Sequence, residues 1–420
     1  MPAHCTGALA AVWICLALGT ASGQTPPATE DAGPLALRMA LKSSVLLSQL
    51  PDDELLFPDR GSATGFWRFR IEPTLRWGEQ ASFDFAFEQR LRLFSSASGL
   101  AGASVLPPDA PAPYRIRQLD WLFASSPHAE WRGEIDRAAV RLHHSRTDLT
   151  VGRQAIGWGR GVLFGAVDLF SPFSPLEADR EWRRGVDAIR ADVKLGDRVS
   201  LDSVGAFADT IDRSAFATRL RGYAGKADIE LLAGSRAHDG FAGVTSSAAV
   251  GDIELHGELA LFLTPAVPGS VVFADAQSIV KAVAGGSYRL PVGNGVLLYG
   301  EYHYSGFGAP SPEQILPQLR DPAFQERYLR GDTQILLRHA VAVLASYEYA
   351  PELALSGEWL HSPVDGSGVI VPSATWTVSD RWSVAINGYL PYGREPVGLT
   401  LYSEYGASSR GVFAQIRMYR

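Results

Sequence analysis

The chain has 420 residues, of which 46% are hydrophobic and 20% are charged, and its formal net charge is −7. The acidic excess is spread along the chain without a basic block, which argues against nucleic-acid binding. After the N-terminal stretch no window offers about eighteen uninterrupted apolar residues, so we predict no transmembrane helix, and the length fits either two or three soluble domains or one large β-barrel.

The N-terminal stretch has the pattern of a secretory signal peptide. The apolar run ALAAVWICLALG at residues 8–19 is too short to span a bilayer comfortably, and the small residues TASGQ follow it. We predict cleavage after Gly23, although no Lys or Arg precedes the apolar run, and a buried N-terminal helix is the alternative. Both cysteines, Cys5 and Cys15, fall in this stretch, so the mature chain would have no disulfide.

The rest of the chain repeats a pattern with a period of two. Large apolar side chains alternate with charged ones in FWRFRIEPTLRW (66–77), FDFAFEQRLRL (83–93) and VDAIRADVKL (186–195). Successive side chains of a strand point to opposite faces, so each segment is predicted to be a strand with one apolar and one charged face.

Short turns and long connections alternate along the chain, as they do in transmembrane β-barrels. The long connections are predicted at residues 95–131, 157–184, 265–276, 307–331 and 391–410. If LRMALKSSVLL (37–47) is the first strand, the count is about eighteen, an even number that places both chain ends in the periplasm. Sixteen strands is the alternative count, and residues 37–47 could instead form a short amphipathic helix.

The apolar faces decide between a membrane barrel and a soluble β-sandwich or propeller. One face of the strand at 66–77 carries Trp67, Phe69, Ile71, Leu75 and Trp77. Such a face suits lipid, and tryptophan near both ends of a strand suits two aromatic girdles. We therefore predict an all-β protein, a transmembrane antiparallel β-barrel at residues 36–420, after a signal peptide at 1–23 and a short periplasmic segment at 24–35.

Two stretches resemble a known family. LTVGRQAIGWGRG, followed by DLFSPFSPLEADREWRRGVDAIR, is similar to a motif of uncharacterised outer-membrane porin-like barrels, and the C-terminal run from WLHSPVDG to LPYG resembles their closing strands. The resemblance covers residues 152–190 and 344–420 and implies an outer-membrane channel without an assigned substrate. A weaker similarity, limited to the GRQ strand end and the size, is to alginate-export barrels.

The connection at residues 157–184 is a candidate constriction loop. Its glycines permit an irregular path, its prolines stiffen it, and its apolar side chains can pack against the wall. Composition alone leaves open an external loop with internal salt bridges, and the family resemblance favours a loop folded into the pore. Charges of both signs across a constriction filter small polar solutes, and the candidate residues are Asp168, Glu177, Asp179, Arg180, Arg183 and Arg184.

The inward faces of the strands predict the wall of the lumen. The residues expected there are Arg38, Arg68, Arg70, Arg76, Arg90, Arg92, Gln154, Arg190 and Lys194. A basic wall attracts anions, but the same arginines could form neutral pairs with neighbouring carboxylates. Arg153 conflicts with strict alternation, which groups it with Val151 toward lipid. Either a bulge at Gly152 turns it inward or it lies at the rim.

We predict an outer-membrane, porin-like channel for diffusion of small hydrophilic solutes, anions among them. The alternatives are an exporter of an anionic polysaccharide and a plugged structural or surface-binding barrel. The sequence offers no placed nucleophile and base, no haem attachment motif, no nucleotide-binding loop and no metal motif, so we expect neither catalysis nor a cofactor. The expected partners are outer-membrane lipid, the transported solutes and the barrel-assembly machinery.

Overall fold

The structure is a computed structural model that describes residues 33–95, 105–107 and 112–420. The predicted signal peptide and most of the predicted segment at 24–35 lie outside the described residues. The strands are β1 (Leu35–Gln49), β2 (Gly61–Trp77), β3 (Ala81–Phe94), β4 (Asp120–Ser126), β5 (Ala129–His144), β6 (Thr147–Gln154), β7 (Val186–Lys194), β8 (Val199–Ala206), β9 (Ala215–Ala224), β10 (Ala227–Arg236), β11 (Asp239–Val250), β12 (Ile253–Thr264), β13 (Gln277–Leu290), β14 (Val296–Ser305), β15 (His339–Ala350), β16 (Leu353–His361), β17 (Gly368–Ser379), β18 (Trp382–Tyr392) and β19 (Arg410–Tyr419).

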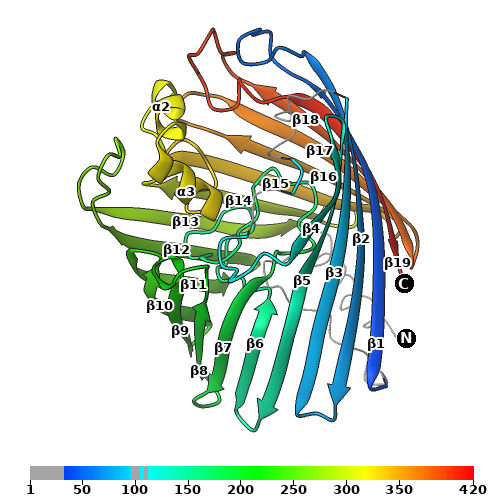
Figure 1. Cartoon of the computed structure of the whole chain (residues 1–420), viewed down its shortest axis with the longest axis vertical. Helices are drawn as coiled ribbons and strands as arrows, with labels where there is room; N and C mark the ends of the chain where they lie inside the picture. Colours follow the sequence, from blue (N-terminus) through cyan, green and yellow to red (C-terminus); the bar gives the residue numbers. More distant parts are fainter. Residues whose placement is uncertain (1–32, 96–104, 108–111) are drawn as a thin grey trace.

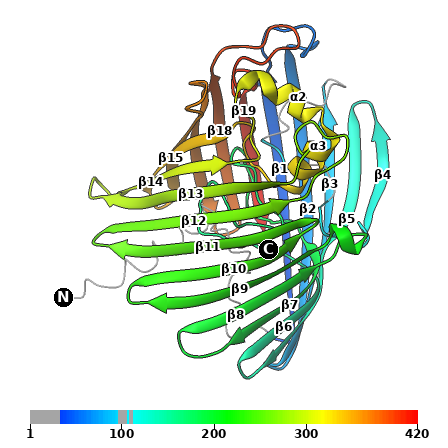
Figure 2. The same ribbon diagram turned by 90° about the vertical axis from the view of Figure 1, so that its left-hand side faces the viewer.

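The strands close into an antiparallel barrel (Figures 1 and 2). Its ring has 18 strands, because β3 pairs directly with β5 and β4 lies outside the ring. The ring closes where β1 pairs with β19, from Ala40 opposite Tyr419 to Gln49 opposite Arg410. The predicted fold and the preferred strand count are confirmed. The count of sixteen and the helix at residues 37–47 were wrong, since residues 37–47 lie within β1.

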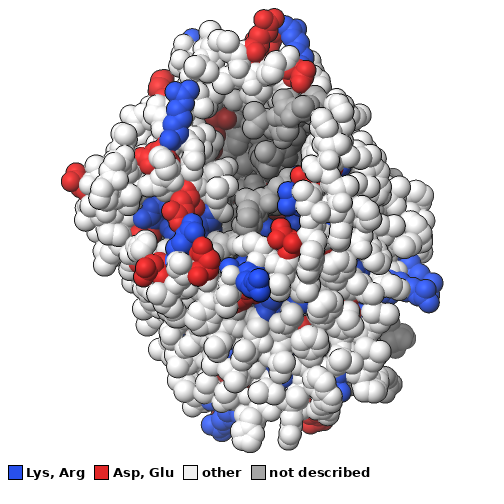
Figure 3. Space-filling view, viewed as in Figure 1, with Lys and Arg blue, Asp and Glu red and all other residues white. Residues whose placement is uncertain are grey.

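The two faces of the wall differ as the alternation predicts. On β2 the side chains of Phe69, Leu75 and Trp77 are exposed, whereas those of Arg68 and Arg70 are buried. Figure 3 shows charged side chains around a hollow and near the ends of the molecule, with a largely uncharged wall between them. On β2 the side chains turned inward are therefore the polar ones, as in barrels that enclose a polar interior.

Short turns gather at one end of the ring, and the other end carries the long connections together with the two-residue β10–β11 turn. Several long connections contain secondary structure of their own. The segment expected at 95–131 contains β4, and the one after β14 contains α2 (Ile315–Leu319), α3 (Pro322–Arg330) and the 3₁₀-helix Pro312–Gln314, while a further 3₁₀-helix, Ile211–Arg213, follows β8. No helix among the described residues is long and apolar enough to cross a membrane.

Helix α3 has a complete set of end signals. The Asp321 carboxylate accepts hydrogen bonds from the backbone N–H groups of Ala323 and Phe324, Pro322 occupies the first turn, and Gly331 ends the helix at φ 85°. The other oxygen of Asp321 accepts from Ser270 and from the backbone of the β12–β13 connection. The same residue therefore caps the helix and ties two long connections together.

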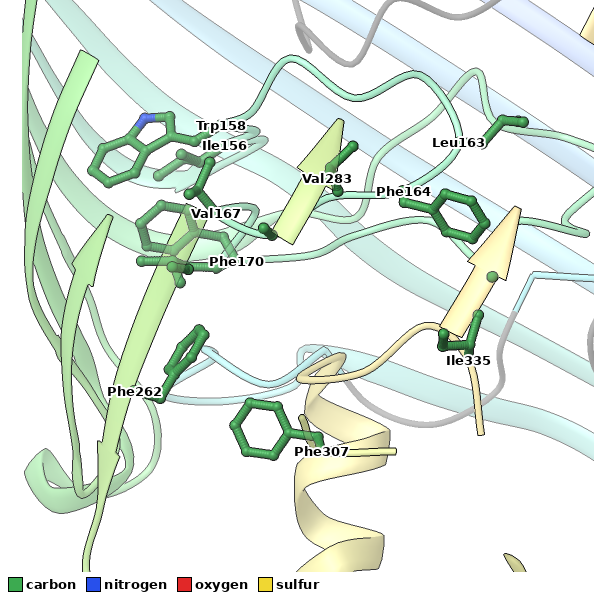
Figure 4. Packing of buried hydrophobic residues seen from close by; sticks show 14 of the residues in the cluster. Ile156, Trp158, Leu163, Phe164, Val167, Phe170, Phe262, Val283, Phe307 and Ile335 are labelled. Carbon is green, nitrogen blue, oxygen red and sulfur yellow. The ribbon is translucent and has the colours of Figure 1, made fainter. Parts of the chain in front are cut away.

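Much of the barrel interior is filled rather than open. A buried apolar cluster joins the β6–β7 connection to β12, β13 and the β14–β15 connection. Figure 4 shows Trp158 beside Phe170, and Phe262 facing Phe307 next to α3. The ring centroids of these two pairs lie 5.2 Å and 5.4 Å apart. The connections thus pack in the interior as a small hydrophobic core.

Candidate functional site

Residues 155–185, which join β6 to β7, cross the interior of the ring (Figure 1). They contact inward side chains around most of its circumference. The contacts are Trp158 with Asp202 on β8, Arg160 with Glu230 on β10, Val167 with Glu258 on β12, Leu163 with Glu301 on β14, Arg180 with Glu358 on β16, Leu176 with Tyr389 on β18, Glu181 with Tyr419 on β19, and Asp179 with Lys42 on β1 and Arg68 on β2.

Two wall carboxylates hold the first half of this segment. Glu258 accepts hydrogen bonds from the backbone N–H groups of Arg160, Gly161, Ala166 and Val167. Glu301 accepts from the next three backbone N–H groups, at residues 162–164, and also contacts His256. Hydrogen bonds to a charged group contribute about 1.5–3 kcal/mol each. These two acids therefore fix a backbone that has no secondary structure of its own.

Glycine is required where this backbone folds so tightly. A Cβ on Gly161 would lie 1.9 Å from the carbonyl oxygen of Phe164, a distance that no side chain tolerates. Gly159 has φ +117°, and a Cβ there would lie 2.8 Å from Glu258 Oε1. The glycines that the sequence analysis read as permitting an irregular path thus permit the turn around the Glu258 carboxylate.

The second half of the segment is held by cations of β1 and β2. Lys42 Nζ lies 2.7 Å from the Asp179 carboxylate, and an Arg68 nitrogen lies 3.3 Å from it. Burial opposes ionisation of Asp179, but Lys42 and Arg68 outweigh it and hold the pKa of this carboxyl below its usual range. The ring of Trp182 lies 3.8 Å from Lys42 Nζ and 4.7 Å from the Arg68 guanidinium, measured to the ring centroid.

These cations belong to a series of residues that lie opposite one another in the register of five neighbouring strands. The register places Arg417, Lys42, Arg68, Arg90 and Arg132 side by side on β19, β1, β2, β3 and β5. Glu88 binds Arg68 and Arg70, and Glu134 binds Arg90 and Arg115. Asp136 binds Arg70, Arg115 and Arg137. These strands therefore carry a row of cations, and carboxylates of the wall and of residues 155–185 pair with it.

A polar cavity of about 70 Å³ lies between this wall and the two long connections. Its volume suffices for a few water molecules. Four arginines and four acids line it, namely Arg68, Arg90, Arg184 and Arg330 with Glu88, Glu134, Asp136 and Glu177.

Glu177 differs from the other acids of the cavity. Glu88, Glu134 and Asp136 are ion-paired, whereas no described residue forms an ion pair with Glu177. Glu177 accepts one hydrogen bond, from the backbone of Ser174 at 3.3 Å. Burial raises the pKa of Glu177 to about 7.

The remaining candidate residues of the segment are distributed among different contacts. Asp168 pairs with Arg183 at 2.6 Å, within the segment itself. Arg180 lies 3.7 Å from Glu358 on β16. Burial lowers the pKa of Arg184, which lines the cavity, to about 10. The six predicted residues therefore do not form one ring of charge, and only Glu177 and Arg184 line the cavity.

The predicted wall residues fall into three groups. Arg68, Arg70, Arg90 and Arg92 are buried on β2 and β3, and Arg92 donates to the Pro107 carbonyl at 2.6 Å. Arg190 pairs with Asp202, and Gln154 binds the carbonyl of Ala188. Arg38, Arg76 and Lys194 lie toward the short-turn ends of their strands, where Arg38 and Lys194 are exposed and Arg76 is half-buried.

Arg153 is the second-to-last residue of β6, and its side chain is buried. Its guanidinium binds Asp187 and the carbonyl oxygens of Arg117, Gln118 and Ile135. The β5–β6 and β6–β7 registers run without interruption past Gly152, so there is no bulge there. Of the two alternatives for Arg153, the bulge is absent. The residue lies near the end of its strand, as a rim position would, but its side chain is buried.

Three contributors were absent from the predicted site. Glu258 and Glu301 are buried acids on the inward faces of β12 and β14, and the alternation of the sequence places them on those faces. Lys42 also lies on a predicted inward face. Nothing in the sequence shows that backbone N–H groups of residues 160–167 are the partners of the two acids, because 98 positions separate Arg160 from Glu258 and 139 separate Val162 from Glu301.

Comparison with known proteins shows what the chain is similar to. No protein-family model and no curated protein matches it. Among solved structures, OccAB1 of Acinetobacter baumannii has a TM-score of 0.56 at 10% identity and covers 94% of this chain and 98% of its own. The outer membrane protein opdK from Pseudomonas aeruginosa has a TM-score of 0.54 at 11% identity, with coverages of 92% and 98%. OccK9 of the same organism has a TM-score of 0.56 at 9% identity and covers 92% of this chain and 98% of its own.

These similarities extend over nearly the whole of each chain. At such low identity they establish the fold, which is that of outer-membrane β-barrels. They agree with the family resemblance at the level of architecture and assign no solute.

Proposed function

We propose that the chain forms an outer-membrane channel through which small hydrophilic solutes diffuse, with residues 155–185 as its constriction. The observation that carries the proposal is the path of this segment. It crosses the interior of a closed barrel and is held by charged side chains on seven strands and tyrosines on two more. It also leaves a small polar cavity beside a row of cations. A loop folded into a barrel narrows a pore that would otherwise be wide and unselective.

The outer surface supports placement in a membrane. Exposed aliphatic and aromatic side chains cover the outward faces of strands all around the ring, as with Leu75 on β2, Leu259 on β12 and Ile416 on β19. Because the Gram-negative outer membrane is where such barrels reside, we place the chain there. Export by the predicted signal peptide and insertion by the barrel-assembly machinery belong to the same proposal.

The charges at the cavity support a modest preference for anions. The described residues that line the cavity include four arginines and four acids, and one of these acids, Glu177, with a pKa of about 7, is only partly ionised at neutrality. The described part of the lining then carries slightly more positive than negative charge. Since most of its arginines are paired with carboxylates, the preference is expected to be small.

The plugged barrel is the second candidate, because a specific observation favours it. A cavity of about 70 Å³ admits only a few water molecules, and aromatic side chains fill the interior beside it. Passage of a solute through this cavity would require residues 155–185 or α3 to move. The exporter of an anionic polymer is less favoured, since a polymer needs a wider path than this cavity offers.

Liposome swelling separates these candidates. Liposomes containing the folded protein are diluted into isotonic solutions of solutes that differ in size and charge. The proposal predicts swelling with small neutral and anionic solutes, slower swelling with cations of equal size, and none with oligosaccharides. A plugged barrel gives the rate of protein-free liposomes for every solute, and an exporter admits the oligosaccharides.

A further inference from the structure

Strands β1 and β19 meet at a junction of the ring that no turn connects (Figure 1). The other neighbouring strands of the ring follow one another along the chain, directly or, for β3 and β5, through β4. Across the junction Gln415 donates a hydrogen bond to Ser44 Oγ at 3.0 Å, over 371 positions of sequence. Contacts between such distant segments close a long loop, which costs more chain entropy than a local contact does.

The junction also brings cations together. Lys42 on β1 lies directly opposite Arg417 on β19 and, on its other side, opposite Arg68 on β2. Lys42 and Arg68 are buried. Like charges that lie directly opposite each other on paired strands are destabilising. The register of the strands by itself therefore leaves repulsion at the junction.

Two acids of the β6–β7 connection lie on these cations. Lys42 Nζ is 2.7 Å from Asp179 Oδ1 and 2.7 Å from Glu181 Oε2. Asp179 also lies 3.3 Å from an Arg68 nitrogen, and the Glu181 carboxylate accepts a hydrogen bond from the Tyr419 hydroxyl at 2.6 Å. Together the two acids contact β1, β2 and β19.

This part of the connection is anchored differently from the part before it. In the described structure, the hydrogen bonds that residues 158–175 make with strands go to β8, β10, β12 and β14, which is every second strand. The polar contacts of residues 176–181 go to β16 and then to four strands in succession, β18, β19, β1 and β2. The contacts are therefore most closely spaced where the first and last strands meet.

We infer that Asp179 and Glu181 give the β6–β7 connection a second function, which is to hold the ring closed at the β1–β19 junction by neutralising its cations. Among the described residues, these two acids are the ion-pair partners of Lys42. A buried charge that loses its partners is strongly destabilising, and local opening of the junction lets water reach it. The backbone pairing of β1 with β19 remains without the acids, so the ring still forms but opens more often at this place.

Hydrogen exchange compares the junction with the rest of the wall. The double variant Asp179→Asn, Glu181→Gln keeps the shapes of both side chains and removes their charges. In detergent micelles we expect several-fold faster amide exchange than in the parent for peptides of β1 and β19, and little change for β12 and β13. Asp168→Asn is the matched control, because this buried acid pairs with Arg183 inside the connection. It should leave exchange in β1 and β19 as it is in the parent.

A disulfide across the junction tests the cause of the effect. Ser44→Cys and Gln415→Cys are combined in a chain whose Cys5 and Cys15 are replaced by serine, with and without the double variant. The temperature of unfolding is read from heat-modifiable mobility in gels. With the disulfide reduced, we expect the double variant to unfold at a lower temperature than its parent. With the disulfide oxidised, we expect the two to unfold at the same temperature, since the junction is then closed covalently.

Three results would overturn the inference. They are equal exchange in the parent and the double variant, an increase of the same size in β1 and in β12, and a difference in unfolding temperature that the oxidised disulfide leaves unchanged. If the double variant does not fold, Glu181→Gln alone provides the comparison, and if the disulfide does not form, hydrogen exchange decides. These measurements involve no solute flux, so their outcome is independent of whether the channel conducts.

Discussion

Glu177 is the acid of the cavity lining whose charge is expected to change near neutrality. Its pKa is raised to about 7. Burial is the main cause and Asp179 acts in the same direction, whereas Arg180 and Arg68 act against the shift. As the pH falls through 7 the lining loses a negative charge while its arginines stay protonated. We predict that anion permeability rises relative to cation permeability between pH 8 and pH 6, as measured by the reversal potential in planar bilayers under a salt gradient.

The Glu177→Gln variant provides the comparison. Its lining has no titrating carboxylate at this position, so its reversal potential should stay near the low-pH value of the parent at both pH values. Glu326→Gln, at an exposed glutamate of α3 that pairs with Arg213, should keep the pH dependence of the parent. A parent channel with the same selectivity at both pH values would contradict the assignment of the titrating group.

Arg153 contributes to stability rather than to the pore. It donates five hydrogen bonds near the end of β6, and three of them go to the backbone carbonyl oxygens of Arg117, Gln118 and Ile135. Removal of one partner of a buried ion pair typically costs about 3–5 kcal/mol. We predict that Arg153→Met lowers the free energy of unfolding by about 3 kcal/mol, measured by urea titration in micelles. Arg146→Met, in the exposed β5–β6 turn, should change it little.

At the scale of elements, the contact of Glu258 and Glu301 with residues 160–167 controls how firmly the β6–β7 connection is held. A glutamine keeps one acceptor oxygen but turns an amide N–H₂ toward donors, so each substitution breaks hydrogen bonds at half of the carboxylate. We predict that Glu258→Gln combined with Glu301→Gln raises single-channel conductance and current noise. Limited proteolysis should also cut the variant within residues 155–185 faster than the parent.

A single substitution on the same strand is the control for this effect. Glu254 lies on the same face of β12 as Glu258, but it is exposed near the short-turn end. Glu254→Gln should therefore leave conductance, noise and proteolysis as they are in the parent. If the double variant conducts with the same amplitude and noise as the parent, the two acids do not hold the segment in the conducting state.

The sequence predicted strands where the pattern was local. Alternation within a single segment sufficed for β2, β3 and β7. The bounds of β2 and β3 extend the predicted ranges by up to five residues, and β7 ends one residue earlier than predicted. β4 was not predicted, because Trp121, Leu122 and Phe123 are consecutive apolar residues at a register shift. α3 carried readable signals that were not used, with Asp321 and Pro322 at its start and Gly331 at its end.

The candidate site was predicted less completely than the fold. The composition of residues 157–184 left an external loop open, and the family resemblance favoured a segment folded into the interior. Parity placed Arg68 and Arg90 on the inner wall. The pairing of each charge could not be read, because Asp179 meets Lys42 across 137 positions of sequence. Ion pairs between distant segments depend on how the ring closes, and the sequence pattern determines only which face each residue occupies.

At the scale of the whole molecule, the barrel combines an apolar exterior with an interior that is part core and part polar cavity. The exterior follows from alternation repeated along 18 strands. The interior follows from the long connections, which bring aromatic side chains such as Trp158, Phe170 and Phe307 into the ring. A large barrel can therefore be narrow inside, since its strand number determines its diameter and its connections determine the free space.

The central claim is that residues 155–185 restrict passage through this barrel. Single-channel conductance of the parent and of a variant with residues 160–182 replaced by a short glycine–serine linker tests it most directly. Heat-modifiable mobility first establishes that both proteins are folded. We predict a small conductance for the parent and a several-fold larger one for the variant. Equal conductances in two folded barrels would contradict the claim.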